Sequence, residues 1–218
     1  MKKYKIIAVI AAYREEKRIF KTVKNTKKFV DEVIVVDDGS KDRTAEMSEN
    51  AGAIVIKYEE NKGAGYATRI GLKKAIEMKP EFVVILDGDG QLNPKYIPKF
   101  IDALEKGADY VYGIRDLSRY PITRKIGNFG LTLLANLFCY TGIKDVECGY
   151  RAMKLDTLKK LNLKANRYER EMDFAYEVWK NKLKIEGIKI KVLRFYPKFA
   201  VARGFKNFLF LLERRFGE

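Results

Sequence analysis

One stretch decides the fold of this chain: Phe82-Val83-Val84-Ile85-Leu86-Asp87-Gly88-Asp89-Gly90-Gln91. Its five consecutive apolar residues predict a strand buried on both faces of a sheet. Asp87 and Asp89 then follow in a glycine-rich turn. Two carboxylates at the end of a buried strand are costly unless a cation neutralises them, and a hard divalent metal that holds a diphosphate is the simplest candidate. Taken alone, the stretch fits equally well a strand-ending Asp-Gly turn with only local hydrogen bonds.

Strands and helices alternate outward from this stretch. The apolar runs predict strands at 4–10, 32–36, 53–57 and 82–86, and the helical spacing predicts helices at 15–30, 42–51, 65–79 and 94–106. Short strands separated by helices of this length indicate βαβ units, and therefore an α/β fold with a mainly parallel central sheet flanked by helices. Ligands of such sheets lie beyond the carboxyl ends of the strands.

The second half of the chain is less regular. We expect a strand at 109–113, helices at 122–140 and around 172–183, and a strand at 188–192. The tail at 205–216 is amphipathic, with a stripe of Phe205, Phe208, Leu209, Leu212 and Phe216. That stripe fits packing on the core and lying on a membrane surface equally well. Without a low-complexity linker or internal repeat, we expect one domain over residues 1–218 with a C-terminal elaboration.

The composition excludes several classes of protein. With 47% hydrophobic and 33% charged residues, the chain is typical of a globular protein. No apolar run approaches the roughly 20 residues that span a bilayer, and no signal pattern appears, so we expect a cytoplasmic location. The absence of histidine excludes Ser-His-Asp chemistry and histidine-containing zinc sites. Cys139 and Cys148 form no Cys-x-x-Cys motif and are expected to be inert thiols.

The positive charge lies mostly in the second half. The net charge is +15; residues 1–110 hold 21 Lys and Arg against 18 Asp and Glu, whereas residues 111–218 hold 23 against 11. A basic half predicts an anionic partner, which is a nucleic acid, an anionic membrane or a phosphorylated substrate. A solvated lysine-rich surface accounts for part of the excess.

Four loops at the predicted strand ends carry polar side chains. They are 11–16 (Ala-Ala-Tyr-Arg-Glu-Glu), 37–44 (Asp-Asp-Gly-Ser-Lys-Asp-Arg-Thr), 61–67 (Asn-Lys-Gly-Ala-Gly-Tyr-Ala) and 87–91. Asp37 and Asp38 could merely cap the next helix. The glycines of the third loop would let the backbone approach a ligand, and its Lys62 could meet a phosphate. Each motif alone is weak, but their order on successive strands is a strong signal.

With these loops the chain resembles the family 2 glycosyltransferases of the GT-A nucleotide-sugar fold, and is most similar to the dolichol-phosphate or polyprenyl-phosphate hexosyltransferases. The likeness covers residues 5–155 well, including Gly113-Ile114-Arg115 and Asp145-x-x-Cys148-Gly149-Tyr150-Arg151. Departures are Ala11 for the usual Pro and Arg14 for the usual Asn. The customary Glu-Val-Pro-Ile strand lacks its Glu and Pro, and the terminal pattern survives only as Arg203-Gly204-Phe205-Lys206.

The resemblance implies a role for particular residues. The nucleotide-sugar-binding residues would be Tyr13, Glu15, Asp37, Lys62 and Asp87. The metal, Mg²⁺ or Mn²⁺, would be held by Asp87, Asp89 and Gln91. The acceptor phosphate would be held by Arg115, Arg124, Asn128 and Arg203, and the reaction would depend on Asp89, Arg115, Arg124 and Arg203. Glu171 is either a site acid or a plain acid at a helix start, and Arg151 is expected to pair with Asp145.

The activity that the resemblance implies is a metal-dependent, inverting transfer of a hexose from a UDP- or GDP-sugar to a polyprenyl or dolichyl phosphate. Residues 1–110 would bind the nucleotide sugar and residues 111–218 the acceptor, at the inner face of the cell membrane. A phosphate acceptor is anionic near neutral pH, with a second pKa of about 6, and needs little help from a base. A sugar hydroxyl acceptor would need one.

Two alternatives stay open at this point. A soluble family 2 enzyme acting on a sugar hydroxyl fits the same loops. A noncatalytic basic protein that binds a membrane or a nucleic acid would explain the charge, but no zinc finger or RNA-binding signature is present, so no nucleic-acid partner is expected.

Overall fold

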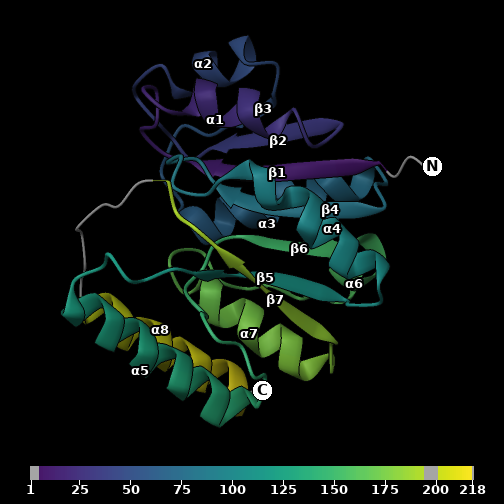
Figure 1. The fold of residues 1–218 in the computed structure, drawn as a ribbon. Coiled ribbons are helices and arrows are strands. Elements are labelled where there is room, and N and C mark those ends of the chain that lie inside the picture. The colour runs from purple at the N-terminus through teal and green to yellow at the C-terminus, as the bar shows by residue number, and fades with distance from the viewer. Residues whose placement is uncertain (1–4, 194–200, 218) are drawn as a thin grey trace.

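A seven-stranded sheet forms the centre of the molecule, which we describe from a computed structural model of residues 5–193 and 201–217, without the side chains of residues 201–203 and 205 (Figure 1). The strand order is β3-β2-β1-β4-β6-β5-β7. The strands are β1 (Ile6–Ala12), β2 (Glu32–Asp37), β3 (Ile54–Lys57), β4 (Phe82–Asp87), β5 (Tyr110–Arg115), β6 (Arg151–Lys154) and β7 (Ile185–Ile190). The mainly parallel α/β sheet expected from the sequence is confirmed.

The first four strands are parallel, and their register places the site. In β4 the residues from Val83 to Leu86 are fully buried, because β1 and β6 flank the strand and helices cover both faces. Ala12 of β1 pairs with Asp37, and Ala11 pairs with Asp87. The carboxyl ends of β1, β2 and β4 therefore meet at one edge of the sheet, as parallel pairing requires.

One strand interrupts the parallel order. β6 is antiparallel to both β4 and β5, whereas β5 and β7 are parallel. The sequence did not reveal β6, because its four residues Arg-Ala-Met-Lys show no clear alternation of apolar and polar side chains. The strand expected at 188–192 begins and ends earlier, since Ile185 already pairs with Tyr110.

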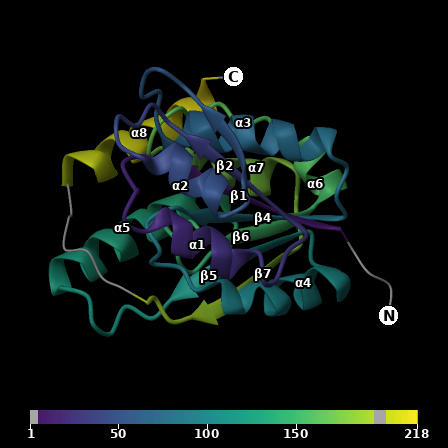
Figure 2. The same ribbon diagram turned by 90° about the horizontal axis from the view of Figure 1, so that it is seen from above.

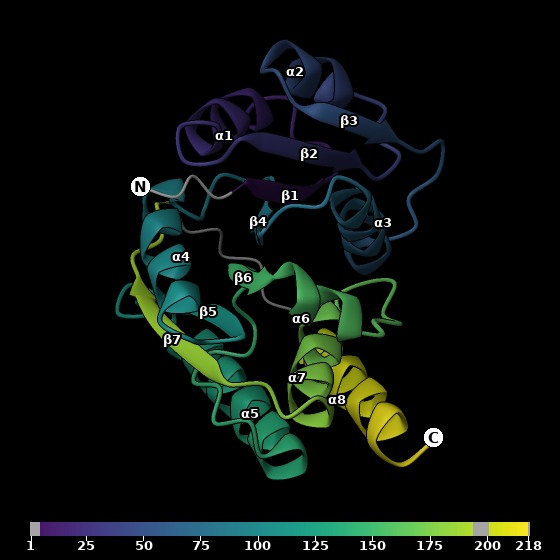
Figure 3. The same ribbon diagram turned by 90° about the vertical axis from the view of Figure 1, so that its right-hand side faces the viewer.

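Helices cover both faces of the sheet (Figures 2 and 3). They are α1 (Ile19–Thr26), α2 (Thr44–Asn50), α3 (Ala64–Glu77), the short η1 (Pro94–Tyr96), α4 (Ile97–Glu105), α5 (Ile122–Cys139), α6 (Leu155–Lys160), α7 (Arg170–Lys180) and α8 (Val201–Phe216). One apolar core joins the sheet to α3, α6 and α7, with α5 and α8 beyond them. A second core joins the opposite face to α1, α2 and α4.

The C-terminal helix α8 lies beside α5 and packs against α7 (Figure 1). Its buried side chains include Leu211 and Arg214, and the Arg214 guanidinium pairs with Asp173 at 3.0 Å and with Glu177 at 2.5 Å. The tail thus docks on the core, one of the two options that the sequence left open. The buried face of α8 differs from the expected apolar stripe, because Leu209 and Phe216 of that stripe remain exposed.

None of the helices within the described residues has both the length and the apolar content needed to cross a bilayer.

Candidate active site

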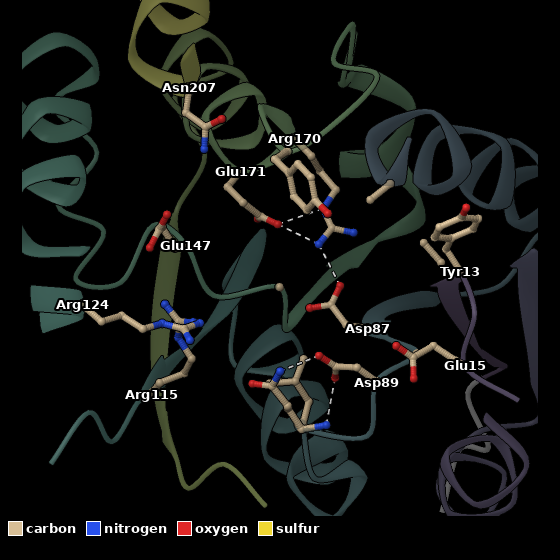
Figure 4. A pocket seen from close by; sticks show the side chains of 17 residues that line it. Tyr13, Glu15, Asp87, Asp89, Arg115, Arg124, Glu147, Arg170, Glu171 and Asn207 are labelled. Atoms are coloured by element: carbon tan, nitrogen blue, oxygen red, sulfur yellow. Dashed lines mark hydrogen bonds and ion pairs between the residues drawn. The ribbon is translucent and has the colours of Figure 1, made fainter. Parts of the chain in front are cut away.

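A cavity of about 300 Å³ opens at the carboxyl ends of β1 and β4 (Figure 4). It gathers side chains from the two halves of the chain at one place. The residues with polar side chains in its wall are Tyr13, Glu15, Asp87, Asp89, Gln91, Arg115, Arg124, Glu147, Tyr168, Arg170, Glu171 and Asn207. The structure therefore brings together seven residues that the sequence singled out for donor, metal or acceptor: Tyr13, Glu15, Asp87, Asp89, Gln91, Arg115 and Arg124.

Asp87, the last residue of β4, is surrounded by cations. Its Oδ1 accepts a hydrogen bond of 2.8 Å from Arg170. Burial alone would raise the pKa of Asp87, but the charges of Arg170, Arg151 and Arg115 outweigh burial and hold this pKa below its ordinary value. A Cβ at Gly149 would collide with Asp87 Oδ2, so this glycine gives the carboxylate its space. Asp87 is therefore ionised and fixed in position.

Asp89 lies in the turn after β4 and is oriented by Gln91. The Gln91 backbone N–H donates to Oδ1 at 2.9 Å, and the Gln91 side-chain amide donates to Oδ2 at 2.6 Å. Burial and the neighbouring Asp87 charge raise the pKa of Asp89 to about 6. The two carboxylates therefore repel each other in the absence of a cation that both could share.

A divalent metal fits this pair of carboxylates. Asp87, Asp89 and the Gln91 amide offer hard oxygen donors of the kind that Mg²⁺ and Mn²⁺ prefer. Within the described residues no group of three or more acidic or thiol side chains surrounds one point. A metal held here would therefore need further oxygen ligands from a bound molecule, and a diphosphate supplies them.

Arg115 and Asn128, both expected at the acceptor phosphate, are held as one unit. The Arg115 guanidinium donates to both oxygens of the buried Asp145, at 2.8 and 2.7 Å, and to Asn128 Oδ1 at 3.2 Å. Arg124 comes from the first turns of α5 and lines the same cavity beside Arg115 (Figure 4). Two guanidinium groups therefore face the cavity on the side opposite to Tyr13.

The expected pairing of Arg151 with Asp145 is wrong. Arg115 occupies both Asp145 oxygens, and Arg151 instead forms an ion pair with Glu171. Arg151 also donates to the Val146 carbonyl at 3.3 Å. The reason is that Arg151 begins β6 and is buried beneath the start of α7, which the sequence could not place.

Arg170 and Glu171 join the first turn of α7 to the site. Arg170 donates to Asp87 at 2.8 Å, to Glu171 at 2.8 Å and to Thr68 Oγ1 at 3.1 Å. Glu171 thus lies in the cavity wall between two arginines. The sequence analysis singled out Glu171 but missed Arg170. The run of three charged residues at 169–171 could have indicated that Arg170 also belongs to the site.

Two further residues in the wall were not foreseen. Burial raises the pKa of Glu147 above its ordinary value, although Arg115 lies nearby. Asn207 of α8 is only 3% exposed, and its Oδ1 has no hydrogen-bond partner within the described residues. An unpartnered buried amide oxygen is unfavourable unless a ligand meets it.

Arg203, the residue of α8 that the sequence singled out, lies in the first turn of this helix, and its side chain is outside the described residues.

A smaller neighbouring cavity of about 160 Å³ shares Tyr13, Asp87 and Tyr168 with the first. Asp38 lines it and accepts the backbone N–H groups of Lys62 at 2.8 Å and Gly63 at 2.7 Å. Asp38 therefore ties the second loop to the third instead of capping α2. The two cavities therefore lie next to each other at the edge of the sheet.

Asp37 and Lys62 are not among the described residues that line these two cavities. Asp37 is fully buried; its Oδ1 accepts the Ser40 N–H at 3.1 Å, and its Oδ2 has no partner within the described residues. The Lys62 ammonium lies over the rings of Tyr58 and Tyr66, at 5.4 and 5.2 Å.

The glycines of the third loop serve packing. A Cβ at Gly63 or Gly65 would collide with the backbone of the 165–167 segment, and Gly63 has φ +104°. These glycines therefore let the backbone approach the 165–167 segment, and not a ligand as the sequence suggested. The contact aligns the start of α3 with the loop that carries Tyr168.

The chain belongs to the family described as glycosyl transferase family 2, whose model matches residues 7–161. Among its relatives is the UDP-N-acetylglucosamine–dolichyl-phosphate N-acetylglucosaminyltransferase of Methanococcus voltae, 36% identical over 98% of this chain and 97% of the relative. Another is the dolichol-phosphate mannosyltransferase of Pyrococcus furiosus, 28% identical over 73% of this chain and 49% of the relative. The protein is therefore a glycosyltransferase.

The fold is also that of solved glycosyltransferase structures. Glucosyl-3-phosphoglycerate synthase of M. tuberculosis aligns with a TM-score of 0.77 at 22% identity, covering 97% of this chain and 81% of that one. One crystal structure of that synthase contains Mn²⁺, uridine diphosphate and glucosyl-3-phosphoglycerate. The GT-A architecture expected from the sequence is confirmed.

Proposed function

We propose that this glycosyltransferase transfers a hexose from a UDP- or GDP-sugar to a polyprenyl or dolichyl phosphate, with inversion at the anomeric carbon and dependence on Mg²⁺ or Mn²⁺. The observation that carries the proposal is the arrangement of the 300 Å³ cavity, where Asp87 and Asp89 lie on one side and Arg115 and Arg124 on the other. The names of the relatives from M. voltae and P. furiosus support a lipid phosphate acceptor.

In this proposal residues 1–110 form the donor half. The nucleoside would occupy the smaller cavity between Tyr13 and Asp38, with Glu15 in the wall of the larger cavity beside it. Asp37 and Lys62, also expected at the donor, would act from outside the two cavity walls. The diphosphate would lie at Asp87, Asp89 and Gln91, whose oxygen donors would hold the metal. When bound, the metal neutralises and orients the departing nucleoside diphosphate. Arg170 keeps Asp87 ionised for that purpose.

Residues 111–218 form the acceptor half. Arg115 is preorganised by Asp145, and a guanidinium fork suits the oxygens of a phosphate. Arg124, Asn128 and Arg203 complete the acceptor site in this proposal. A phosphate oxygen held there would attack the anomeric carbon from the side opposite to the diphosphate, and a single displacement inverts the configuration. The phosphate is already anionic, so no base has to remove a proton.

A sugar hydroxyl acceptor is the second candidate, and one observation favours it. Glu147 lies in the cavity wall with a raised pKa, which is a property of general bases. A hydroxyl acceptor would make the reaction depend on Glu147, whereas a phosphate acceptor would make it depend on Arg124.

The decisive experiment is a transfer assay with radiolabelled UDP- and GDP-sugars, with and without Mn²⁺, using dolichyl phosphate or a soluble sugar as acceptor. We expect a lipid-extractable, metal-dependent product that Arg124→Ala reduces strongly and Glu147→Gln reduces little. The exposed Arg43→Ala variant is the matched control. A water-soluble product lost in Glu147→Gln would instead establish the second candidate.

We place the enzyme at the cytoplasmic face of the membrane, bound peripherally and without a nucleic-acid partner.

A further inference from the structure

The outer face of α5 exposes a stripe of large apolar side chains. They recur every three or four residues along the helix and are each between 55% and 77% exposed: Ile122, Ile126, Phe129, Leu133, Leu137 and Tyr140. The helix has 18 residues and is therefore roughly 27 Å long. Six large exposed apolar side chains on one side of a helix are unusual on a monomeric protein and indicate an interaction site. We call these six residues the α5 stripe.

The α5 stripe is not needed to pack the helix. The opposite side of α5 buries Leu131, Ala135 and Cys139 in the core. Asn128 on the buried side binds Arg115. The helix is therefore apolar on two faces, one facing the core and one facing outward, which is what an amphipathic helix at a further interface requires.

The charges around the α5 stripe are positive. α5 contains Arg124 and Lys125 and no acidic residue. The neighbouring α8 adds the exposed Lys206 and the half-buried Arg215 against one exposed acid, Glu213, whereas its Arg214 is buried against Asp173 and Glu177. An apolar face accompanied by cations has the composition of a helix that lies in the headgroup region of an anionic bilayer.

The helix that carries the α5 stripe also carries residues of the candidate active site. Arg124 and Asn128, on the same helix, belong to the acceptor side of the candidate active site. Asn128 lies on the inner side of α5 and Arg124 faces the cavity, whereas the stripe lies on the outer side. Under the proposed function, a bilayer along the stripe would therefore bring lipid-linked phosphates within one helix diameter, ~10 Å, of the acceptor side.

We infer that the α5 stripe is the surface by which this protein docks on an anionic phospholipid bilayer, with α5 lying flat in the interface. A second copy of the chain is the less favoured occupant, because a two-fold contact through α5 would bring together two halves that each hold 23 Lys and Arg against 11 Asp and Glu.

Flotation with phospholipid vesicles tests the inference without donor or acceptor. The full chain is mixed with vesicles of phosphatidylcholine and phosphatidylglycerol, or of phosphatidylcholine alone. We expect binding to the anionic vesicles that weakens with salt. The double variant Phe129→Glu, Leu133→Glu should bind at least about tenfold less, because two apolar groups no longer enter the interface. Phe20→Glu, at a 38% exposed aromatic on α1, is the matched control and should bind like the wild type.

Other outcomes would overturn the inference. Equal flotation of the wild type and the double variant would show that another surface docks. A wild-type dimer in light scattering, converted to a monomer by the double variant and indifferent to vesicles, would assign the α5 stripe to a second copy. Circular dichroism melting checks that the double variant folds.

Failure of the proposed function is recognised separately. The double variant should keep wild-type activity on a short, water-soluble polyprenyl phosphate analogue, since the stripe lies outside the cavity. If no acceptor phosphate supports transfer while vesicle binding still depends on the stripe, the proposed function fails and the docking surface stands. If transfer to the soluble analogue is present but vesicle binding is absent, the inference fails and the function stands.

Discussion

At the scale of single residues, the site depends on charged groups whose neighbours determine their ionisation. Asp87 and Asp89 are two residues apart, yet Arg170 lowers the pKa of Asp87 while burial and Asp87 itself raise that of Asp89. The sequence predicted both carboxylates, because the motif is local. It could not predict Arg170 or Asn207, since their contacts join residues that lie far apart in the chain.

Replacing Asp89 tests the metal site. Asp89→Asn keeps the size of the side chain but removes its charge and one of the two oxygens that accept hydrogen bonds from Gln91. We expect kcat to fall at least about a hundredfold, because a metal contributes several kcal/mol to stabilising the leaving group. The transfer assay with Mn²⁺ measures this, and a melting temperature at or above that of the wild type shows that the fold is kept. Unchanged activity would contradict a role for Asp89.

The reactivity of the two thiols, Cys139 and Cys148, tests whether these side chains are buried. Burial raises the pKa of Cys139 to about 11 and that of Cys148 to about 12. A raised pKa keeps the thiol neutral at every pH below these values, and the neutral thiol is a poor nucleophile. We therefore expect no reaction with Ellman's reagent at pH 8 in the native protein, and reaction of both thiols in guanidinium chloride. Fast modification of the native protein would contradict the burial of these side chains.

At the scale of elements, apolar runs predicted β1, β2, β3 and β4 well, since each lies within one local stretch. The antiparallel β6 was missed because it is short and is defined by pairing with the distant β4 and β5. The helix α6 was missed because its six residues are too few to show a helical period. The phase of α8 was misjudged for a related reason. Its buried face carries two polar residues, Asn207, which lines the cavity, and Arg214, which pairs with acids of α7, and a hydrophobicity pattern cannot show that such residues are buried.

The attachment of α8 depends on one buried cation. Arg214 pairs with Asp173 and Glu177 of α7, and both acids are buried. Arg214→Met would leave two buried carboxylates without their partner, and we expect a loss of about 3–5 kcal/mol in the free energy of unfolding. Urea unfolding measures the loss. The neighbouring, exposed Glu213→Gln is the control and should leave the free energy of unfolding nearly unchanged.

At the scale of the whole molecule, a single sheet supports both sides of the cavity. The four polar loops 11–16, 37–44, 61–67 and 87–91 follow β1 to β4, whereas Arg115 ends β5 and Arg170 begins α7. The sequence predicted that these four loops meet, because parallel strands bring their carboxyl ends to one edge of the sheet. It did not predict how the second half closes the cavity, which depends on the packing of α5, α7 and α8.

Ligand binding should therefore stabilise the entire fold. We expect uridine or guanosine diphosphate with Mn²⁺ to raise the melting temperature by roughly 5–10 °C at a hundredfold excess over Kd, which corresponds to about 2.7 kcal/mol. Differential scanning fluorimetry measures the shift. Asp89→Asn should lose the part of the shift that needs Mn²⁺, whereas Arg43→Ala should keep it. A shift independent of metal in the wild type would contradict the metal site.

The contact between Gly149 and Asp87 has a consequence for engineering. Because β6 runs backwards, the segment that enters it arrives at the rim where β4 and β5 leave the sheet. A side chain at Gly149 would displace the Asp87 carboxylate, so this position should stay glycine. Attempts to exchange sugar preference by loop grafting should therefore spare Gly149 and vary the rim around Tyr13 and Tyr168 instead.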